Sequence, residues 1–245
     1  MDIEVSPTLA TVWGLFQQNI SINQLLGNSE VLTWAAAWRG SDKIMDGDLL
    51  RDGKRKLLRN IHELLEDADA VVTWNGNGFD LKILSKEFLL IGFKPPTPYK
   101  SIDLLATSRS KFRFTSNKLD FVAKQLGVPC KIQHRGHEMW LDCMARKPAA
   151  FKEMRTYNRG DIPPLQGIYE RFLPWIPGHP HHALYDGGKA CCPRCGNADP
   201  KRFQHRGEER SRTLVYKRLQ CKVCGGWTRL RVPDKAYSRP ELVSA

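Results

Sequence analysis

The sequence predicts an α/β protein with a mixed β-sheet flanked by helices, followed by a small cysteine-rich β module. Short apolar strand patterns alternate with amphipathic helix patterns up to about residue 175, as in layered α/β domains. Segment 176–188 is rich in Pro, Gly and His, and five of the seven cysteines lie between positions 191 and 224. We therefore expect a first domain at 1–175, a linker at 176–188, and a C-terminal module with a basic tail at 189–245.

Four runs have the composition of sheet strands. They are 10–16 (ATVWGLF), 31–38 (VLTWAAAW), 70–74 (AVVTW) and 99–105 (YKSIDLL). Apolar runs of this length, rich in β-prone residues, are typical of strands inside a sheet. Segment 40–53 is polar and rich in turn-forming residues, so we expect a loop there.

The helices are predicted from apolar residues at helical spacing. Segment 54–68 places five apolar side chains on one face, namely Leu57, Leu58, Ile61, Leu64 and Leu65. Segment 118–126 is amphipathic and ends at Gly127, as expected for a helix with a glycine after its last turn. Segments 80–91, 149–157 and 166–172 are further helix candidates.

The charge of the chain points to a polyanionic partner. The formal net charge is +12, and residues 186–245 alone carry 14 basic and 6 acidic side chains. A basic tail of this kind favours nucleic acid as the partner, with solubility as the alternative. The sequence has neither an apolar run of about 18 residues nor a secretory signal pattern. We therefore expect no membrane association, reduced cysteines and a cytoplasmic location.

Three motifs place carboxylates in a suggestive order. Asp2 and Glu4 would project from the same face of a strand, because residues two apart share a face. Asp80 follows the strand pattern at 70–74 and precedes a helix pattern, so it lies at a strand end or simply caps the helix. Tyr157 and Asp161 are four residues apart and would share one helix face, although Asp161 could instead cap the next helix. Paired carboxylates suit a divalent cation.

Taken together, the motifs Asp-x-Glu, Asn-x₃-Phe-Asp and Tyr-x₃-Asp resemble the DEDD superfamily of DnaQ-like 3′–5′ exonucleases. Because the third motif begins with tyrosine, it resembles the third motif of the DEDDy subgroup. The resemblance implies an RNase H-like fold and two Mg²⁺ or Mn²⁺ ions held by Asp2, Glu4, Asp80 and Asp161. It also implies that Tyr157 positions the attacking water.

On this resemblance we expect a metal-dependent 3′–5′ exonuclease acting on nucleic acid, with DNA favoured over RNA and a single-stranded 3′ end as substrate. Two alternatives stay open. One is a structure-directed endonuclease on the same fold, and the other is a catalytically weak nucleic-acid-binding protein.

Two features depart from that family's pattern. Only Met1 precedes Asp2, so we expect the native start to lie upstream and the first strand to be short. Gly160 and Pro163 flank Asp161, and proline inside a helix crowds the preceding turn. We therefore expect a kink or break near Asp161, with weak or Mn²⁺-dependent activity.

The cysteines form two knuckles, Cys192-x₂-Cys195 and Cys221-x₂-Cys224, separated by 25 residues. This spacing is typical of a closed four-thiolate Zn²⁺ site and resembles a zinc ribbon, with strands expected at 213–220 and 227–232. Cys191 is the alternative to Cys192 as a ligand. We expect one structural Zn²⁺ on which folding of this small module depends. The ribbon is expected to bind the nucleic acid backbone, and docking of a partner protein is the alternative.

Overall fold

The computed structural model describes residues 1–129, 135–185, 188, 190–211 and 213–234. The chain divides into two compact units, Met1–Tyr169 and Glu170–Ala245, which are described separately. The domain boundary near residue 175 and the linker at 176–188 stay predictions from the sequence. Among the described residues, no helix has both the length and the apolar character that a membrane span requires.

The first unit contains a mixed set of strands, as the sequence predicts. Strands β1 (Asp2–Val5), β4 (Val31–Ala37) and β5 (Ile44–Asp48) pair antiparallel in the order β1-β4-β5. Strands β6 (Ala70–Thr73) and β7 (Lys100–Asp103) form a separate parallel pair. The amino group of Met1 donates a 2.8 Å hydrogen bond to the carbonyl of Val72, which links the two sets of strands.

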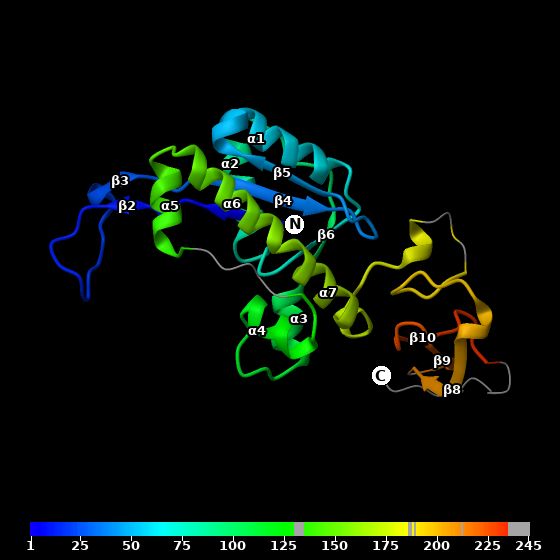
Figure 1. Ribbon diagram of the computed structural model, residues 1–245. Coiled ribbons are helices and arrows are strands. Elements are labelled where there is room, and N and C mark those ends of the chain that lie inside the picture. The colour runs from blue at the N-terminus through cyan, green and yellow to red at the C-terminus, as the bar shows by residue number, and fades with distance from the viewer. Residues whose placement is uncertain (130–134, 186–187, 189, 212, 235–245) are drawn as a thin grey trace. The chain divides into compact units, whose positions relative to one another are not determined.

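One face of the three-stranded sheet is apolar and packs against α1 (Leu49–Glu66) (Figure 1). Ile3, Trp34 and Gly47 align across the strands, and Trp34 Nε1 donates a 3.0 Å hydrogen bond to the carbonyl of Leu57. A side chain at Gly47 would lie 2.5 Å from Trp34 Nε1, so this close packing requires glycine. The predicted apolar row is buried at Leu57, Leu58, Ile61 and Leu65 and partly buried at Leu64.

Helix α6 (Pro148–Gly160) covers the opposite face of the same strands and packs beside α5 (His137–Met144). Phe151 and Met154 of α6 are fully buried in the core. Helix α7 (Ile162–Phe172) follows after one residue, Asp161, whose φ of −82° and ψ of −15° are still helical. The predicted break therefore falls at Asp161, but it is mild.

Three further helices complete the first unit. Helix α2 (Asp80–Leu90) follows β6, and α3 (Leu104–Lys111) follows β7. Helix α4 (Leu119–Leu126) ends at Gly127, which has the left-handed φ of 63° expected from the sequence. The predicted helices thus form, although α1 begins at Leu49 rather than at residue 54 and α7 begins at Ile162 rather than at residue 166.

The predicted sheet strand at 10–16 was wrong, because only Ala10 of this segment lies in a strand. Strands β2 (Leu9–Ala10) and β3 (Leu25–Gly27) form a hairpin that projects beyond the ends of β1 and β4 (Figure 1). Trp13 is 99% exposed and Phe16 is 86% exposed. Because β1 pairs directly with β4, the apolar residues of the hairpin have no sheet face to cover, and composition alone could not reveal this.

The turn-rich segment 40–53 forms a loop only up to residue 43, because β5 and the start of α1 occupy the rest of it. This strand, IMDGD, lacks an apolar face since Asp46 and Asp48 point to the side covered by α6. Helices α3 and α5 were not predicted either.

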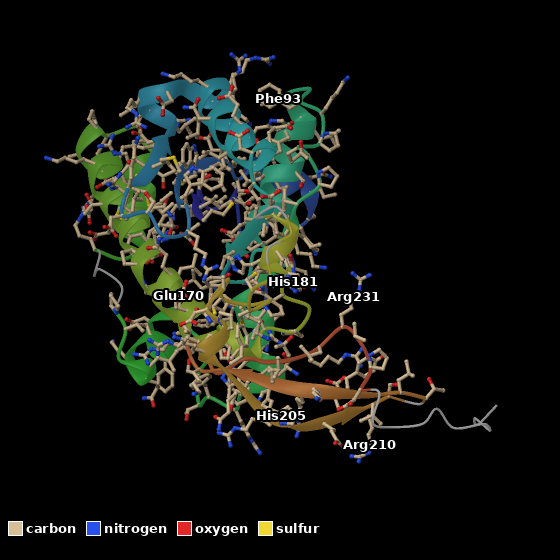
Figure 2. All side chains as sticks on the ribbon, turned by 90° about the vertical axis from the view of Figure 1, so that its right-hand side faces the viewer. Phe93, Glu170, His181, His205, Arg210 and Arg231 are labelled. Carbon is tan, nitrogen blue, oxygen red and sulfur yellow. The ribbon has the colours of Figure 1, made fainter. Side chains whose placement is uncertain are left out.

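The second unit is built around a three-stranded antiparallel sheet. Strands β8 (Phe203–Arg210), β9 (Val215–Cys221) and β10 (Trp227–Arg229) pair in the order β10-β9-β8. Short 3₁₀ turns occur at Leu173–Trp175, His182–Leu184 and Pro200–Arg202. Figure 2 marks His205 and Arg210 on β8 and Arg231 after β10. Two of these strands fall in the predicted segments, and β8 was not predicted.

Candidate functional site

Strand β1 presents its two acidic side chains on one face. Ile3, between them, is buried on the other face against the core, so Asp2 and Glu4 project together as the two-residue period requires. Across the ladder, Asp2 lies opposite Ala35 and Glu4 lies opposite Thr33. These small partners leave space above the sheet that α6 fills.

Asp161 completes a group of three carboxylates. One oxygen each from Asp2, Glu4 and Asp161 lies within 4.8 Å of the others, although Asp161 is 157 residues beyond Glu4 in the chain. Asp161 is also buried. Three carboxylates this close repel one another unless a cation offsets their charge, and oxygen ligands suit Mg²⁺ or Mn²⁺. The chemistry of these residues therefore fits a divalent metal ion.

Asn158 is part of this group, and the sequence analysis missed it. Its Nδ2 donates a 2.7 Å hydrogen bond to Oδ2 of Asp2, and its side chain is fully buried. Its Oδ1 is buried with no hydrogen-bond partner in the part of the chain that the structure describes. The available signal was its position three residues before Asp161, which puts both on one helix face.

Tyr157 lies one helical turn before Asp161, as expected from the motif. Its ring is buried and meets the edge of Trp140, with 6.1 Å between the ring centroids. The two residues come from neighbouring helices, α6 and α5. This packing restricts the orientation of the tyrosine ring.

Asp80 lies against β1 but outside the group of three carboxylates. Its side chain is 3% exposed, and Oδ1 accepts a 3.1 Å hydrogen bond from the backbone N–H of Ile3. The alternative that Asp80 merely caps α2 was wrong, because Phe79 is the capping residue. Burial raises the pKa of Asp80 to about 6, although backbone hydrogen bonds and the Met1 amino group oppose this rise.

The loop before Asp80 is held by Asp103. The carboxylate of Asp103 accepts hydrogen bonds from the N–H groups of Asn75 at 3.0 Å and Asn77 at 3.2 Å, and it also caps α3. A side chain at Gly76 would lie 2.2 Å from Oγ1 of Thr73, so only glycine fits. Asp103 thereby positions the turn that leads into α2 and Asp80.

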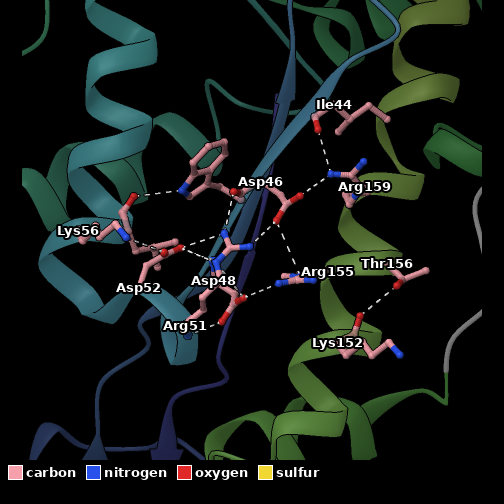
Figure 3. Close-up of polar contacts among 12 residues, drawn as sticks. Ile44, Asp46, Asp48, Arg51, Asp52, Lys56, Lys152, Arg155, Thr156 and Arg159 are labelled. Carbon is pink, nitrogen blue, oxygen red and sulfur yellow. Dashed lines mark hydrogen bonds and ion pairs between the residues drawn. The ribbon is translucent and has the colours of Figure 1, made fainter.

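A second pair of carboxylates on the same sheet face is paired with arginines (Figure 3). Asp46 aligns with Ala35 and Asp48 aligns with Thr33, so β5 repeats the acidic spacing of β1. From α6, Arg159 pairs with Asp46, and Arg155 pairs with Asp48 at 3.2 Å. Two positive charges from α6 thus neutralise the β5 carboxylates, while Asp161 at the end of α6 joins those of β1.

The network on β5 extends to α1. Arg51 Nη1 lies 3.3 Å from Asp46, and Arg51 Nη2 lies 3.0 Å from Asp52. Asp52 in turn accepts a 3.2 Å hydrogen bond from the N–H of Asp48. These contacts tie both helices to the edge strand, and they set the position of α6 over the sheet.

In the second unit, the four predicted cysteines lie together. One sulfur each from Cys192, Cys195, Cys221 and Cys224 lies within 4.8 Å of the others, and among the described residues the group does not include Cys191. The distance from Cys192 to Cys224 is 3.7 Å, and from Cys195 to Cys221 it is 3.8 Å. A tetrahedral site with Zn–S bonds of about 2.3 Å requires sulfurs about 3.8 Å apart. The thiols therefore fit a zinc ion.

The backbone around the cysteines explains this convergence. Gly196 and Gly225 each follow a knuckle with φ of 78°, a conformation that favours glycine. Their N–H groups donate back to the carbonyls of Cys192 and Cys221, at 3.0 and 2.8 Å. Burial raises the pKa of the Cys224 thiol to about 11. A cation held between the sulfurs would favour the thiolate form.

Comparisons with protein families and with solved structures each found a similarity. A family model described as the RNase_H superfamily matches residues 45–173, slightly more than half of the chain. The match includes Asp80, Tyr157 and Asp161 and begins after β1. A solved structure of the family B DNA polymerase from the hyperthermophilic archaeon Pyrobaculum calidifontis is 20% identical, with a TM-score of 0.49. That match covers 59% of this chain and 22% of the polymerase chain.

No curated protein matches this chain. The family match confirms the RNase H-like fold expected from the sequence. The first unit provides the sheet, the helices on both faces and the carboxylates described above. The chain belongs to the RNase_H superfamily.

Proposed function

We propose that this protein is a metal-dependent nuclease that removes nucleotides from the 3′ end of nucleic acid. The observation that carries the proposal is the convergence of Asp2, Glu4 and Asp161 on one face of an RNase H-like sheet. The order of the three sequence motifs supports a 3′–5′ exonuclease of the DEDDy type. DNA with a single-stranded 3′ end is the substrate that we favour.

The residues divide between metal binding and positioning. Asp2, Glu4 and Asp161 would hold one Mg²⁺ or Mn²⁺ ion, and Asp80, which lies against β1, would help to hold a second. Such ions would activate water and stabilise the leaving 3′ oxygen of a phosphodiester. Tyr157 would orient the attacking water through its hydroxyl. The arginine pairs of α6 would keep Asp161 over the strand.

The four cysteines would hold one structural Zn²⁺. Sulfur separations of 3.7 and 3.8 Å support this assignment. A fully ligated site of this type contributes to folding. The second unit would then be a ribbon that binds nucleic acid.

The proposal is tested with 5′-labelled single- and double-stranded DNA and RNA, in Mg²⁺ or Mn²⁺. Wild-type protein is compared with Asp161→Asn and with Asp120→Asn. Asp120 is a helix carboxylate that pairs with Lys124, so it controls for the loss of one charge. We expect products that shorten stepwise from the 3′ end, a loss of more than about 100-fold in Asp161→Asn, and little change in the control.

Two other outcomes would point elsewhere. Discrete internal cuts that Asp161→Asn abolishes would indicate a structure-directed endonuclease. Binding without cleavage, equal in all three proteins, would indicate a nucleic-acid-binding protein without catalysis.

A further inference from the structure

Strands β9 and β10 bring planar side chains to one face of the second unit's sheet. Arg218 pairs with Arg229 across the antiparallel ladder, and Gln220 pairs with Trp227. Residues directly opposite in such a ladder share a face, and so do residues two apart on one strand. Tyr216, Arg218 and Gln220 of β9 therefore lie on the same face as Trp227 and Arg229 of β10.

The other face of these strands carries a thiol of the cysteine group at one end, and Lys217 on that face is exposed. Leu219 and Thr228 are partly buried, and Cys221 is fully buried within the cysteine group. Alternation along β9 thus separates a side that carries a cysteine of the group from the side that carries Arg and aromatic residues. The side with the Arg and aromatic residues is accessible, since Trp227 is 49% exposed.

Each arginine on this face lies on an aromatic ring. The guanidinium carbon of Arg229 is 3.9 Å from the centroid of the Tyr216 ring, and that of Arg218 is 5.0 Å from the Trp227 ring. Both contacts are within the range of a cation–π interaction. The sheet face therefore carries two stacked pairs, each made of a planar cation and a ring.

Contacts at their edges hold the two guanidinium groups in place. Arg218 Nε donates a 3.1 Å hydrogen bond to the carbonyl of Arg206, and Arg229 Nη1 lies 3.3 Å from a carboxylate oxygen of Glu209. Because guanidinium donors lie in the plane of the group, these contacts use its edge rather than its faces. The Arg229 side chain remains 41% exposed.

We propose that this face, defined by Tyr216, Arg218, Trp227 and Arg229, binds single-stranded nucleic acid by stacking its bases. The inference rests on the proposed function only in taking nucleic acid as the ligand. It goes beyond binding of the backbone, because it assigns the contact to bases and the four residues to it. Bases stack on aromatic rings and on guanidinium planes, and this mode tolerates any sequence.

The charge and chemistry of the face favour this occupant over others. The segment from residue 186 onward carries a formal net charge of +8, or about +6 with four thiolates on one Zn²⁺, and this charge complements a polyanion. In a duplex the bases are already stacked on one another, so their planes are not available to a flat sheet face. A single strand offers both the charge and the free base planes.

The test measures binding of the full-length zinc-loaded protein, without divalent ions that support cleavage. A dye-labelled thymidine 20-mer and a 20-base-pair duplex are titrated by fluorescence anisotropy. We expect Trp227→Ala and Tyr216→Ala each to weaken single-strand binding about tenfold. Arg229→Lys keeps the charge but loses the planar group, and we expect a loss of similar size.

Lys217→Ala is the matched control, since Lys217 alternates to the opposite side of β9. It removes one positive charge, and we expect it to weaken single-strand and duplex binding by a similar factor of less than about threefold. Trp227→Phe keeps an aromatic ring and should restore most of the affinity lost in Trp227→Ala. Zinc content, measured for every variant, separates loss of contact from loss of fold.

Three results would overturn the inference. The first is that Arg229→Lys, or both alanine variants, bind the single strand as tightly as wild type does. The second is that wild type binds the single strand and the duplex with equal affinity, and the third is that it binds no nucleic acid. The last would leave the face to a protein partner. The same titrations with Asp161→Asn, which is expected to lack cleavage, keep this inference distinct from the proposed function. A wild-type protein that binds single strands by stacking but cleaves none of the nucleic acids tested would support the inference while the proposed function failed.

Discussion

Asn158 and Asp2 join the third sequence motif to the first through a 2.7 Å hydrogen bond from Nδ2 to Oδ2. The bond crosses from α6 to β1 and uses one oxygen of a carboxylate that lies within 4.8 Å of two others. Asn158 therefore acts as a positioning residue for Asp2. This relationship gives the first prediction.

We predict that Asn158→Ala weakens Mn²⁺ binding by about tenfold, because Asp2 loses the donor that orients it. Isothermal titration of the full-length protein with Mn²⁺ measures the affinity, and nuclease kinetics measure kcat. Asn19→Ala, an exposed amide in the β2–β3 hairpin, is the control. Equal metal affinity in wild type and Asn158→Ala would contradict a positioning role.

A second prediction concerns the arginines of α6. Arg155→Met leaves Asp48 without the 3.2 Å ion pair and should lower the free energy of unfolding by about 1–3 kcal/mol. It should also reduce nuclease activity, because α6 carries Asn158 and leads to Asp161. Chemical denaturation measures the stability, with Lys152→Met on the exposed side of the same helix as the control.

A double variant separates charge from packing. Asp48 keeps a weaker contact with Arg51 Nε at 3.8 Å in this variant. If the lost charge of Arg155 beside Asp48 causes the loss of stability, Asp48→Asn should recover part of it in the Arg155→Met background. Additive losses in the double variant would show that the ion pair does not couple the helix to the strand.

The raised pKa of Asp80 predicts a pH dependence of stability in the metal-free protein. The pKa of Asp80 is about 6 in the folded protein and near 3.8 in the unfolded chain. At pH values between these two, the folded protein therefore binds more protons at this carboxyl than the unfolded chain does. Stability should therefore fall as pH rises from about 4 to 6, by roughly 3 kcal/mol, and then level off.

Asp80→Asn keeps an oxygen acceptor for the N–H of Ile3 but cannot ionise. The difference in unfolding free energy between wild type and this variant, measured with chelator from pH 4.5 to 7.5, should change across this range. Parallel stability curves for the two proteins would rule out an elevated pKa at this position.

The cysteine group predicts which thiol is needed for zinc. Cys192→Ser should lose the metal, whereas Cys191→Ser should keep one zinc per chain, because only Cys192 lies in the group. Elemental analysis of the purified proteins measures the content. Limited proteolysis should cut the Cys192→Ser protein after about residue 170 while the first unit persists, since that unit has its own core. Zinc loss from Cys191→Ser would reverse the assignment.

The β2–β3 hairpin should be dispensable for folding. Residues 7–29 are all exposed or partly buried. The base of the hairpin is held by two hydrogen bonds between Ser6 and Glu30, one in each direction. Replacing residues 9–27 with a short glycine–serine linker should shift the Tm by less than about 3 °C. A large drop in Tm, measured by calorimetry, would mean that the hairpin covers part of the core.

Parts of the fold could be predicted because their signal is local. The spacing of Leu57, Leu58 and Ile61 requires only the helical period, and it correctly located the buried face of α1. Gly127 correctly marked the end of α4 for the same reason. In contrast, β5 has no apolar alternation, because Asp46 and Asp48 lie on the side covered by α6. These carboxylates are neutralised by arginines more than 100 residues away in the sequence, which no local pattern reveals.

The site divides in the same way. Local patterns were enough to predict that Asp2 and Glu4 share one face of a strand and that two cysteine pairs lie on tight turns. The reason is that side-chain direction within a strand or turn follows from local backbone geometry. Three other features could not be predicted in this way: Asp161 and Asn158 lie beside Asp2, Asp80 accepts a hydrogen bond from the backbone of Ile3, and Trp13 is exposed. These outcomes depend on how α6, α2 and the hairpin pack against β1 and β4, and packing between distant segments has no local signature.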